Sequence, residues 1–566
     1  MNTVYENEIY ENIVSKMNFE KKSDLPGGFV VVLSKDNIVM GVISDADLRR
    51  VSANLPNFRS LKASEIMRPD FIFLFEDELT SNNLERLRHK FRERAIELKL
   101  SVQFIPILSR EQKLVRVIHI TDILQIWEAI EQKIIILGLG YVGLTLALSL
   151  ADKGEIVYGL DQNRDIIDAL KSEKSPIFEQ GVEFIIKKVI NRNLLVFEDL
   201  PLLISNLESG TRCFIICVGS PVTDQVLDSK QLDGALNALC RVISKGDTVI
   251  LRSTVPIGFS RAFCNSITKK SGLLPGVDFY FGYAPERTLE GNAIEECRTI
   301  PQIYSGITDK CSSKIELILN KISNIKIKCE SVEACEMGKL ISNSYRDVIF
   351  GFSNEVANLS RRYNLDVNKL ISDVNSGYPR NHIMKPSPGV GGPCLTKDSY
   401  ILTNEFDFEN SVIRSARKLN EELAQDFGDQ ITKYLRFSQK KNVLVLGLAF
   451  KGFPETNDIR NSTSMIVVNK IKEIDVNLKI FDFVIKKKEL QENSNLYFDF
   501  NSNWVPDVVC ILNNHKDNFS YFLSILKKVE LRKKISLFDP WYLCSSIYDD
   551  GRLDYIQTLS KTYHKI

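Results

Sequence analysis

Residues 134–143 read IIILGLGYVG, an apolar run followed by glycines in the spacing Gly138-x-Gly140-x-x-Gly143. The run predicts a buried strand, and the glycines predict a tight turn that opens a helix. In this pattern the first glycine permits the turn, the second lets a pyrophosphate approach the backbone, and the third lets helix and strand pack closely. The stretch therefore predicts a dinucleotide site in an α/β domain, with a purely structural turn as the alternative.

The next predicted strand, residues 156–160, ends at an acid in the position that this pattern requires. Asp161 stands where an acidic side chain accepts the ribose 2′-hydroxyl of a dinucleotide. Because the same acid repels a 2′-phosphate, the pattern favours NAD over NADP. The strand–turn–helix context argues against an unrelated acid beside a structural turn.

The composition narrows the class of protein. The chain has 566 residues, and chains of this length contain roughly three to four domains. A net charge of +1 gives no reason to expect a nucleic-acid or membrane partner. The 11 cysteines include no CxxC pair, which argues against a zinc cluster or a disulfide framework and indicates a reducing cytoplasm. We expect no metal.

Two segments bear on cellular location. Residues 1–8, MNTVYENE, lack the basic start and apolar run of a signal peptide. Residues 134–151 are uncharged and near the lower length limit of a transmembrane helix. The tight glycine turn inside them favours a strand, a turn and a helix of a cytoplasmic protein instead.

The first 130 residues contain an internal repeat. Residues 29–33 predict a strand, 34–37 a turn and 38–43 its hairpin partner, before a helix capped at Ser44. A similar unit recurs at residues 104–124. We therefore expect two copies of one small α/β module.

From Lys133 onward, strands and helices alternate as in a parallel doubly wound sheet. The candidate strands of the first block are residues 134–137, 156–160, 213–218, 248–251 and 279–283. Residues 331–375 read as one long helix. The candidate strands of a second block are residues 442–447, 478–482, 508–512 and 535–540. The fold class is α/β, with two Rossmann-like doubly wound domains joined by a long central helix.

A reactive thiol is predicted in the loop PGVGGPCLTKD, residues 388–398. Cys394 follows residues with no bulk to bury it and is expected at a helix N-terminus, with Asp398 one turn later. Other cysteines, such as Cys213, Cys217 and Cys510, lie in apolar strands and are expected to be inert. A nicotinamide site and a nucleophilic thiol suggest oxidation of an alcohol to an aldehyde, capture by sulfur, and oxidation to an acid.

Three polar residues of the predicted long helix share one stripe. Glu336, Lys339 and Asn343 have the spacing i, i+3 and i+7. A solvated face of a connecting helix is one interpretation. The other is that the lysine and the amide stabilise an oxyanion on a carbon bonded to the cysteine.

Residues 133–566 resemble the nucleotide-sugar 6-dehydrogenase family, which includes UDP-glucose and UDP-N-acetylmannosamine dehydrogenases. The matching segments, in family order, are GLGYVGL (138–144), STVPIG (253–258), APER (284–287), Glu336-x-x-Lys339-x-x-x-Asn343, GVGGPC (389–394), GLAFK (447–451) and DIRNS (458–462). The resemblance implies a four-electron oxidation of the sugar C6 alcohol with two NAD per turnover.

The resemblance assigns roles to individual residues. Cys394 would form a thiohemiacetal and then a thioester, while Lys339 and Asn343 would stabilise the oxyanion. Asp398, with Lys339, would hold a water that takes the hydroxyl proton. Glu286 would assist hydrolysis of the thioester.

Contacts with cofactor and substrate follow from the same resemblance. Thr254 would lie near the nicotinamide and a catalytic water. The implied cofactor contacts are Gly138, Gly140, Tyr141, Val142, Gly143, Asp161, Ser220, Thr254, Glu290 and Arg460. The implied substrate contacts are Lys339, Asn343, Gly391, Phe450 and Lys451. Closure of the cleft between the two α/β domains would bury the chemistry.

The chain departs from the family pattern in three places. Residues 451–460, which include GFPE at 452–455, form a longer segment than the commonest family form. Ser220 stands where many members have Thr, and Pro393 where His or Ser is frequent. None of these changes removes a reacting group.

Residues 1–130 resemble the cystathionine-β-synthase (CBS) domain pair, which usually binds adenine nucleotides in the cleft between its halves. The hydroxyl-x-x-Asp signature is present as Ser44-x-x-Asp47, whereas His119 replaces the usual hydroxyl before Asp122. The resemblance implies an adenine nucleotide at this pair. A structural or dimerising pair without ligand is the alternative.

We therefore expect four domains: a CBS pair (1–130), an NAD-binding Rossmann domain (133–330), a central helical and dimerisation domain with the cysteine loop (331–436) and a UDP-sugar-binding domain (437–566). Members of the family are usually dimers through the long helix, so a homo-oligomer is expected.

The motifs APER (284–287), NSYRD (343–347) and NE (354–355) resemble the N-acetylhexosamine branch of the family. The expected substrate is a UDP-N-acetylhexosamine used for surface polysaccharide, with UDP-glucose as the runner-up. Two other classes remain open. One is an adenine-nucleotide-sensing regulatory protein with an inactive dehydrogenase half, and the other is a two-electron alcohol dehydrogenase.

Overall fold

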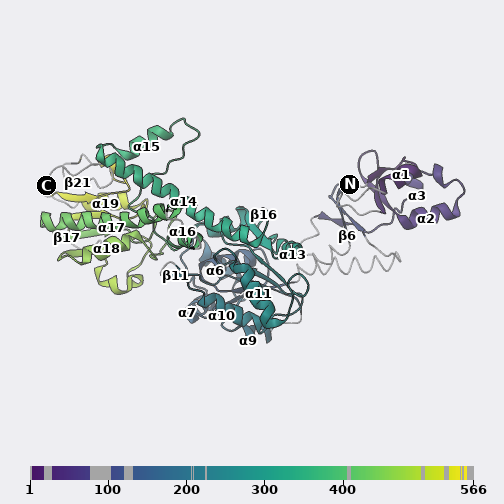
Figure 1. The fold of residues 1–566 in the computed structure, drawn as a ribbon, viewed down its shortest axis with the longest axis horizontal. Helices are drawn as coiled ribbons and strands as arrows, with labels where there is room; N and C mark the ends of the chain where they lie inside the picture. Colours follow the sequence, from purple (N-terminus) through teal and green to yellow (C-terminus); the bar gives the residue numbers. More distant parts are fainter. Residues whose placement is uncertain are drawn as a thin grey trace. The chain divides into compact units, whose positions relative to one another are not determined.

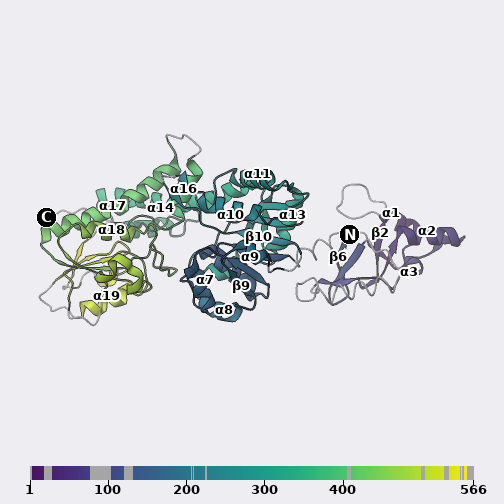
Figure 2. The same cartoon turned by 90° about the horizontal axis from the view of Figure 1, so that it is seen from below.

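The structure is a computed structural model that describes residues 3–17, 28–76, 104–119, 132–205, 207, 210–223, 226–404, 410–498, 504–527, 534–547, 550 and 553–556. Contacts divide the chain into two compact units. The first contains residues 1–133 and 209–211, and the second contains residues 134–208 and 212–566. Figures 1 and 2 give two views of the ribbon.

The first unit contains two three-stranded sheets with the same plan. Their strands are β1 (Thr3–Tyr5), β2 (Phe29–Leu33) and β3 (Val39–Ser44), and β4 (Leu74–Phe75), β5 (Phe104–Leu108) and β6 (Leu114–His119). In each sheet the first strand pairs parallel with the second, and the second pairs antiparallel with the third. The predicted repeat is therefore confirmed for the strands of the two copies.

The repeat extends to the hairpin turns and to the core. Asn37 and Gln112 occupy corresponding turn positions, with φ of 60° and 59°. Val31 and Leu108, from the two copies, belong to one apolar cluster. The helices of the first copy are α1 (Tyr10–Met17), α2 (Asp45–Asn54) and α3 (Ala63–Ile66). The expected helix at residues 121–124, with Asp122, lies outside the described residues.

The second unit begins with an eight-stranded sheet of order β16-β15-β14-β13-β10-β7-β8-β9. Its strands are β7 (Lys133–Leu137), β8 (Val157–Leu160), β9 (Leu194–Phe197), β10 (Arg212–Ile216), β13 (Thr248–Leu251), β14 (Tyr280–Tyr283), β15 (Gln302–Gly306) and β16 (Lys326–Lys328). The run β9-β8-β7-β10-β13-β14 has the 3-2-1-4-5-6 order of a doubly wound sheet. In such a sheet a ligand binds beyond the carboxyl ends of β7 and β10, where the strand order reverses.

Helices cover both faces of this sheet because its strands are apolar on both sides. One face carries α6 (Tyr141–Asp152), α7 (Arg164–Lys171), α8 (Val182–Val189), α12 (Ala293–Thr299) and α13 (Asp309–Leu319). The other carries α9 (Leu200–Ser205), α10 (Lys230–Cys240) and α11 (Phe259–Ser271). A short hairpin, β11 (Val222–Thr223) with β12 (Val226–Leu227), follows β10.

The prediction of one helix over residues 331–375 is wrong. The chain forms α14 (Val332–Arg362) and then a separate α15 (Val367–Asn375). Asn364 adopts φ of 56°, in the left-handed region, and so ends the helical path. The Asp366 side chain then caps the next helix by accepting hydrogen bonds from the amides of Asn368 and Lys369.

A second sheet, β18-β17-β19-β20-β21, closes the second unit. Its parallel strands are β17 (Asn442–Leu446), β18 (Asn477–Phe481), β19 (Val508–Ile511), β20 (Ile535–Phe538) and β21 (Leu553–Ile556). Helices α17 (Val412–Ser438) and α18 (Thr463–Lys472) cover one face, and α19 (Asn518–Leu526) covers the other. Helix α14 packs against α16 (Leu395–Thr403) and α17, and so joins the first sheet to the second block (Figure 1).

Residues 134–151 form β7, the glycine turn and most of α6, as predicted. None of the helices in the described part of the chain has the length and apolar character that crossing a membrane requires.

Candidate active site

A cavity of about 1080 Å³ opens at the carboxyl ends of β7, β10 and β13. Helices α14, α16 and α17, the cysteine loop and the segment before α18 also line it. The predicted site residues that line it are Gly140, Tyr141, Val142, Ser220, Thr254, Glu286, Glu290, Lys339, Cys394 and Arg460. The predicted cofactor and thiol positions thus share one cavity.

The glycine turn has the geometry that a dinucleotide requires. Gly138 adopts φ of +92°, and a Cβ added at Gly143 would lie 1.8 Å from the Gly138 carbonyl oxygen. A Cβ added at Gly140 would meet nothing within 4 Å, so the backbone is open on the side where a pyrophosphate would approach. Asp161 braces the turn, because its Oδ2 accepts the Leu139 amide at 2.7 Å. These residues fit NAD.

Cys394 is the N-cap residue of α16 and is exposed, as predicted for a reactive thiol. The surrounding protein atoms of the cavity raise the pKa of this thiol, and so does the Asp398 carboxylate. Lys339 and Lys397 act in the opposite direction and lower it. The thiolate therefore depends on nearby positive charge.

Asp398 and Asn343 form one hydrogen-bonded set behind the thiol. Asn343 Nδ2 donates to Asp398 Oδ2 at 2.5 Å, and Lys397 Nζ lies 2.8 Å from Asp398 Oδ1. Arg346 donates to Asn343 Oδ1 at 2.5 Å and so fixes which way the amide points. The sequence analysis did not single out Lys397 or Arg346. Their only signal was proximity in the chain to Asp398 and Asn343.

The stripe on α14 is buried, so its interpretation as a solvated helix face is wrong. Glu336, Lys339 and Asn343 are 0%, 9% and 2% exposed. Lys339 lines the cavity and has no hydrogen bond or ion pair with another described residue, which leaves its ammonium available to a developing charge. Glu336 has a structural role, because it accepts the amides of Gly258 at 2.6 Å and Ser260 at 2.7 Å and caps α11.

Glu286 is held by a buried arginine that the sequence analysis missed. Arg252 Nη2 donates to Glu286 Oε2 at 2.6 Å, while the amides of Arg287 and Thr288 donate to Oε1. Burial alone would raise the pKa of Glu286, but Arg252 and these hydrogen bonds hold it below the ordinary value. Glu286 is therefore ionised and fixed at the cavity wall.

The predicted substrate residues Gly391, Phe450 and Lys451 lie outside the cavity lining and serve contacts between segments. A Cβ added at Gly391 would lie 2.4 Å from the Asn461 carbonyl oxygen, and one at Gly392 would lie 2.6 Å from the Phe450 ring. The cysteine loop is thus packed directly on the second block. Lys451 Nζ donates to the Glu290 carbonyl oxygen at 2.6 Å.

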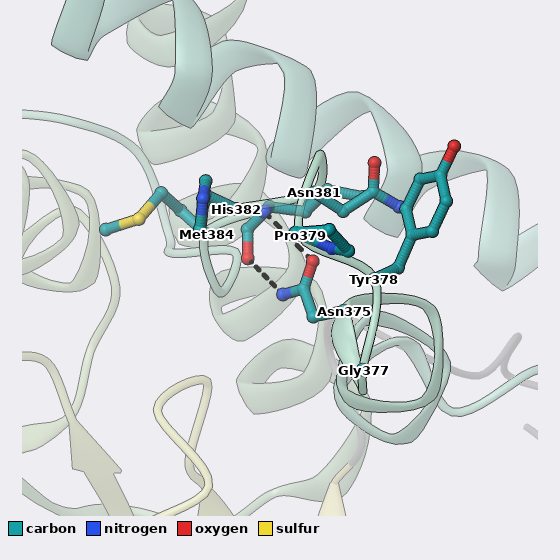
Figure 3. A pocket seen from close by; sticks show the side chains of 8 residues that line it. Asn375, Gly377, Tyr378, Pro379, Asn381, His382 and Met384 are labelled. Carbon is teal, nitrogen blue, oxygen red and sulfur yellow. Dashed lines mark hydrogen bonds between the residues drawn. The ribbon is translucent and has the colours of Figure 1, made fainter.

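A second hollow, of about 600 Å³, lies in the segment after α15 (Figure 3). Asn375 shapes it by donating to the Ile383 carbonyl oxygen at 2.8 Å and accepting the Ile383 amide at 3.1 Å. The lining contains none of the predicted site residues.

Glu290 occupies an unusual electrostatic position between the two blocks. Its pKa is raised to about 7: burial is the largest cause and the Asp458 carboxylate adds to it, while Arg460 and Lys451 act in the opposite direction. Arg460 Nη2 lies 3.9 Å from Glu290 Oε1, and Thr456 Oγ1 lies 3.4 Å from Oε2.

A Glu290→Gln variant tests this position. A carboxyl group with a native pKa of about 7 and an ordinary value of 4.5 takes up a proton on folding, so stability is lost as pH rises between these values. Gln cannot ionise. We therefore expect the free energy of unfolding of the variant, relative to that of the wild type, to rise by about 2 kcal/mol from pH 5 to pH 8. Thermal unfolding at both pH values measures the gain. The exposed Glu295→Gln serves as control, and a pH-independent difference at Glu290 would contradict the assignment.

Comparisons with known proteins identify the family. The UDP-glucose/GDP-mannose dehydrogenase family matches through its NAD binding domain at residues 132–323, its central domain at 333–422 and its UDP binding domain at 444–549. A UDP-N-acetyl-D-mannosamine dehydrogenase of Pyrococcus horikoshii is 32% identical over 350 residues, which are 60% of this chain and 82% of that protein.

Two further proteins are similar. An NDP-N-acetyl-D-galactosaminuronic acid dehydrogenase of Ralstonia nicotianae is 27% identical over 341 residues, covering 59% of this chain and 78% of that protein. The solved structure of the UDP-N-acetyl-mannosamine dehydrogenase from S. aureus matches with a TM-score of 0.63 and 26% identity, covering 75% of this chain and 98% of that chain. The chain therefore belongs to the UDP-glucose/GDP-mannose dehydrogenase family and is an NAD-dependent nucleotide-sugar dehydrogenase.

Proposed function

We propose that this protein oxidises the C6 alcohol of UDP-N-acetylmannosamine to the uronic acid through a thioester on Cys394. The observation that carries the proposal is the shared cavity, which is lined by an exposed cysteine at a helix N-terminus, by Lys339 and by the open glycine turn. NAD held at that turn would accept two electrons in each of the two oxidations.

The first oxidation needs a proton acceptor near the hydroxyl. Asp398 fits this role, through a water shared with Lys339, because Lys397 and Asn343 hold its carboxylate in place. The Cys394 sulfur then adds to the aldehyde carbon. Lys339 and the Asn343 amide are the donors that would stabilise the resulting oxyanion.

The second oxidation leaves a thioester, which water must hydrolyse. Glu286 suits this step because Arg252 keeps it ionised at the cavity wall, where it orients a water and accepts its proton. The leaving thiolate returns to the field of Lys339 and Lys397, which favour its charged form.

The substrate class is argued from two sources. The similar proteins from P. horikoshii and S. aureus are described as acting on UDP-N-acetylmannosamine, and the R. nicotianae protein carries an N-acetylgalactosaminuronic acid name. The motifs at residues 284–287, 343–347 and 354–355 resemble the same branch. We therefore propose a UDP-N-acetylhexosamine of the mannosamine type as the substrate, and we propose that the enzyme acts in the cytoplasm to supply a uronate for surface polysaccharide.

NADH formed per sugar consumed tests the reaction. We expect two NADH per UDP-N-acetylmannosamine in a panel that includes UDP-N-acetylglucosamine, UDP-glucose and GDP-mannose. Cys394→Ser should lower acid formation by roughly a thousandfold because the thioester cannot form. Cys240→Ser, at a partly buried cysteine away from the cavity, is the matched control. One NADH per sugar would indicate a simple alcohol dehydrogenase, and normal acid formation by the Ser variant would refute the role of Cys394.

We also propose a homodimer that forms through α14. Apolar side chains at spacings of four and seven residues follow one side of this helix: Met337, Ile341, Tyr345, Phe352 and Leu359, which are 41–64% exposed. A contiguous apolar stripe of this kind is typical of an interface between protein surfaces.

Negative charge introduced into that stripe by substitution should separate the subunits. We expect Tyr345→Glu combined with Phe352→Glu to halve the mass measured by light scattering, because the interface would bury unpaired carboxylates. Phe184→Glu, on α8 and more open to solvent at 76% exposure, should leave the mass unchanged. A wild-type protein of monomeric mass would contradict the interface.

For the first unit we propose a CBS pair, within the four-domain arrangement expected from the sequence, that binds an adenine nucleotide. Its support is the repeated sheet plan and the Ser44-x-x-Asp47 signature. In this structure the Asp47 carboxylate, 1% exposed, accepts the Ser44 hydroxyl at 2.6 Å and Arg68 Nε at 2.5 Å. A ribose would have to replace one of these partners.

Calorimetry on the full chain tests this ligand. With saturating NADH present to fill the cofactor turn, we expect AMP, ADP or ATP to give a binding heat that Asp47→Asn weakens about tenfold, the loss of one charge-assisted hydrogen bond. Asp36→Asn, in the exposed hairpin turn of the same copy, should bind normally. The absence of heat with all three nucleotides would leave the pair as a structural module.

A further inference from the structure

Glu179 is a buried carboxylate that the sequence analysis did not single out. It lies between α7 and α8 and is 7% exposed. Three donors converge on it: the Tyr141 hydroxyl, the Gly291 amide at 2.7 Å and the Ala293 amide at 2.8 Å. A buried carboxylate with three donors fixes the position of each of them.

The donors come from two functional segments. Tyr141 follows Gly140 and is the first residue of α6, on the cofactor turn. Gly291 and Ala293 belong to the segment that opens α12. The Gly291 amide also donates to the Tyr141 hydroxyl oxygen at 3.1 Å, so the two segments are joined twice.

The second segment also contacts the second α/β block directly. The carbonyl oxygen of Glu290, next to Gly291, accepts Lys451 Nζ at 2.6 Å. Gly291 has φ of +94°, and a Cβ there would lie 2.6 Å from Pro454, so this segment packs tightly on the chain that follows β17. A continuous path of contacts therefore runs from the glycine turn through Glu179 to Lys451.

The electrostatics of Lys451 are consistent with this path. Its own burial lowers the pKa of the ammonium, while the carboxylates of Glu290 and Glu179 raise it. Glu179 therefore acts electrostatically on Lys451 and through a hydrogen bond on Tyr141.

We propose that Glu179 is a positioning residue that couples occupancy of the cofactor turn to the affinity of the second block for the uridine diphosphate end of the substrate. The inference rests on the proposed function, because it requires NAD at the turn and UDP at the second block. A bound pyrophosphate fixes the start of α6, and Glu179 transmits that constraint to the 290–293 segment and to Lys451. The coupling is reciprocal, so UDP also tightens the binding of NADH.

The test measures the dissociation constant of UDP by calorimetry without and with saturating NADH, two ligands that cannot react. For the wild type we expect NADH to tighten UDP binding about tenfold, within the usual range of such couplings. Glu179→Gln should bring this ratio to within about twofold of one, because the amide cannot hold all three donors as strongly. Tyr141→Phe removes a single hydroxyl from the path and should lower the ratio in the same direction. Glu183→Gln, whose exposed side chain pairs with Lys187 on α8, should keep the wild-type ratio.

Each result decides the question. A wild-type ratio of one, or a folded Glu179→Gln with the wild-type ratio, overturns the inference. If Glu179→Gln does not fold, Tyr141→Phe with the wild-type ratio overturns it equally. A wild type that forms two NADH per sugar but shows no coupling would remove only this inference. A wild type that binds neither UDP nor NADH would instead remove the proposed function.

Discussion

The buried ion pair between Asp347 and Arg417 is the constraint on which the active-site geometry depends. Both side chains are 0% exposed, with Arg417 Nη1 3.0 Å from Asp347 Oδ1. Arg417 also donates to the Val390 carbonyl oxygen at 2.7 Å, and Ser399 donates to Asp347 Oδ2 at 3.0 Å. One pair thus joins α14, α17, the cysteine loop and α16. Loss of either partner would leave an uncompensated buried charge, at a cost of about 3–5 kcal/mol.

In both sheets an aspartate accepts a backbone amide of the glycine turn, but the two turns differ in the space they leave for a ligand. Asp161 accepts the Leu139 amide after the first glycine turn, and Asp482 accepts the Leu448 amide after the second, both at 2.7 Å. Beyond that likeness the turns differ, because Ala449 stands in the second turn at the position of Gly140, the glycine that leaves the first turn open. The first turn therefore has the bare backbone that a pyrophosphate approaches, and the second does not.

Charged groups of both signs act on the pKa of the Cys394 thiol. Positive charge from Lys339 and Lys397 favours the thiolate, while Asp398 and the enclosing protein atoms oppose it. Lys397 and Arg252 form close ion pairs with Asp398 and Glu286, at 2.8 Å and 2.6 Å. Arg460, by contrast, lies 3.9 Å from the Glu290 carboxylate, and Asp458 adds negative charge there. The pKa values of the two glutamates are thus shifted in opposite directions, that of Glu286 down and that of Glu290 up, by their neighbours rather than by residue type.

The sequence by itself determined the features that depend on local pattern. The glycine turn at residues 138–143, the strands and the exposed N-cap position of Cys394 follow from spacing and side-chain size, and the structure agrees with them. The break after α14 was missed because a single left-handed residue, Asn364, decides it. Only the tertiary structure decided the pairs Arg252–Glu286 and Arg417–Asp347 and the donors of Glu179. These contacts join residues 34 to 114 positions apart, and nothing in the local pattern of either partner specifies the other.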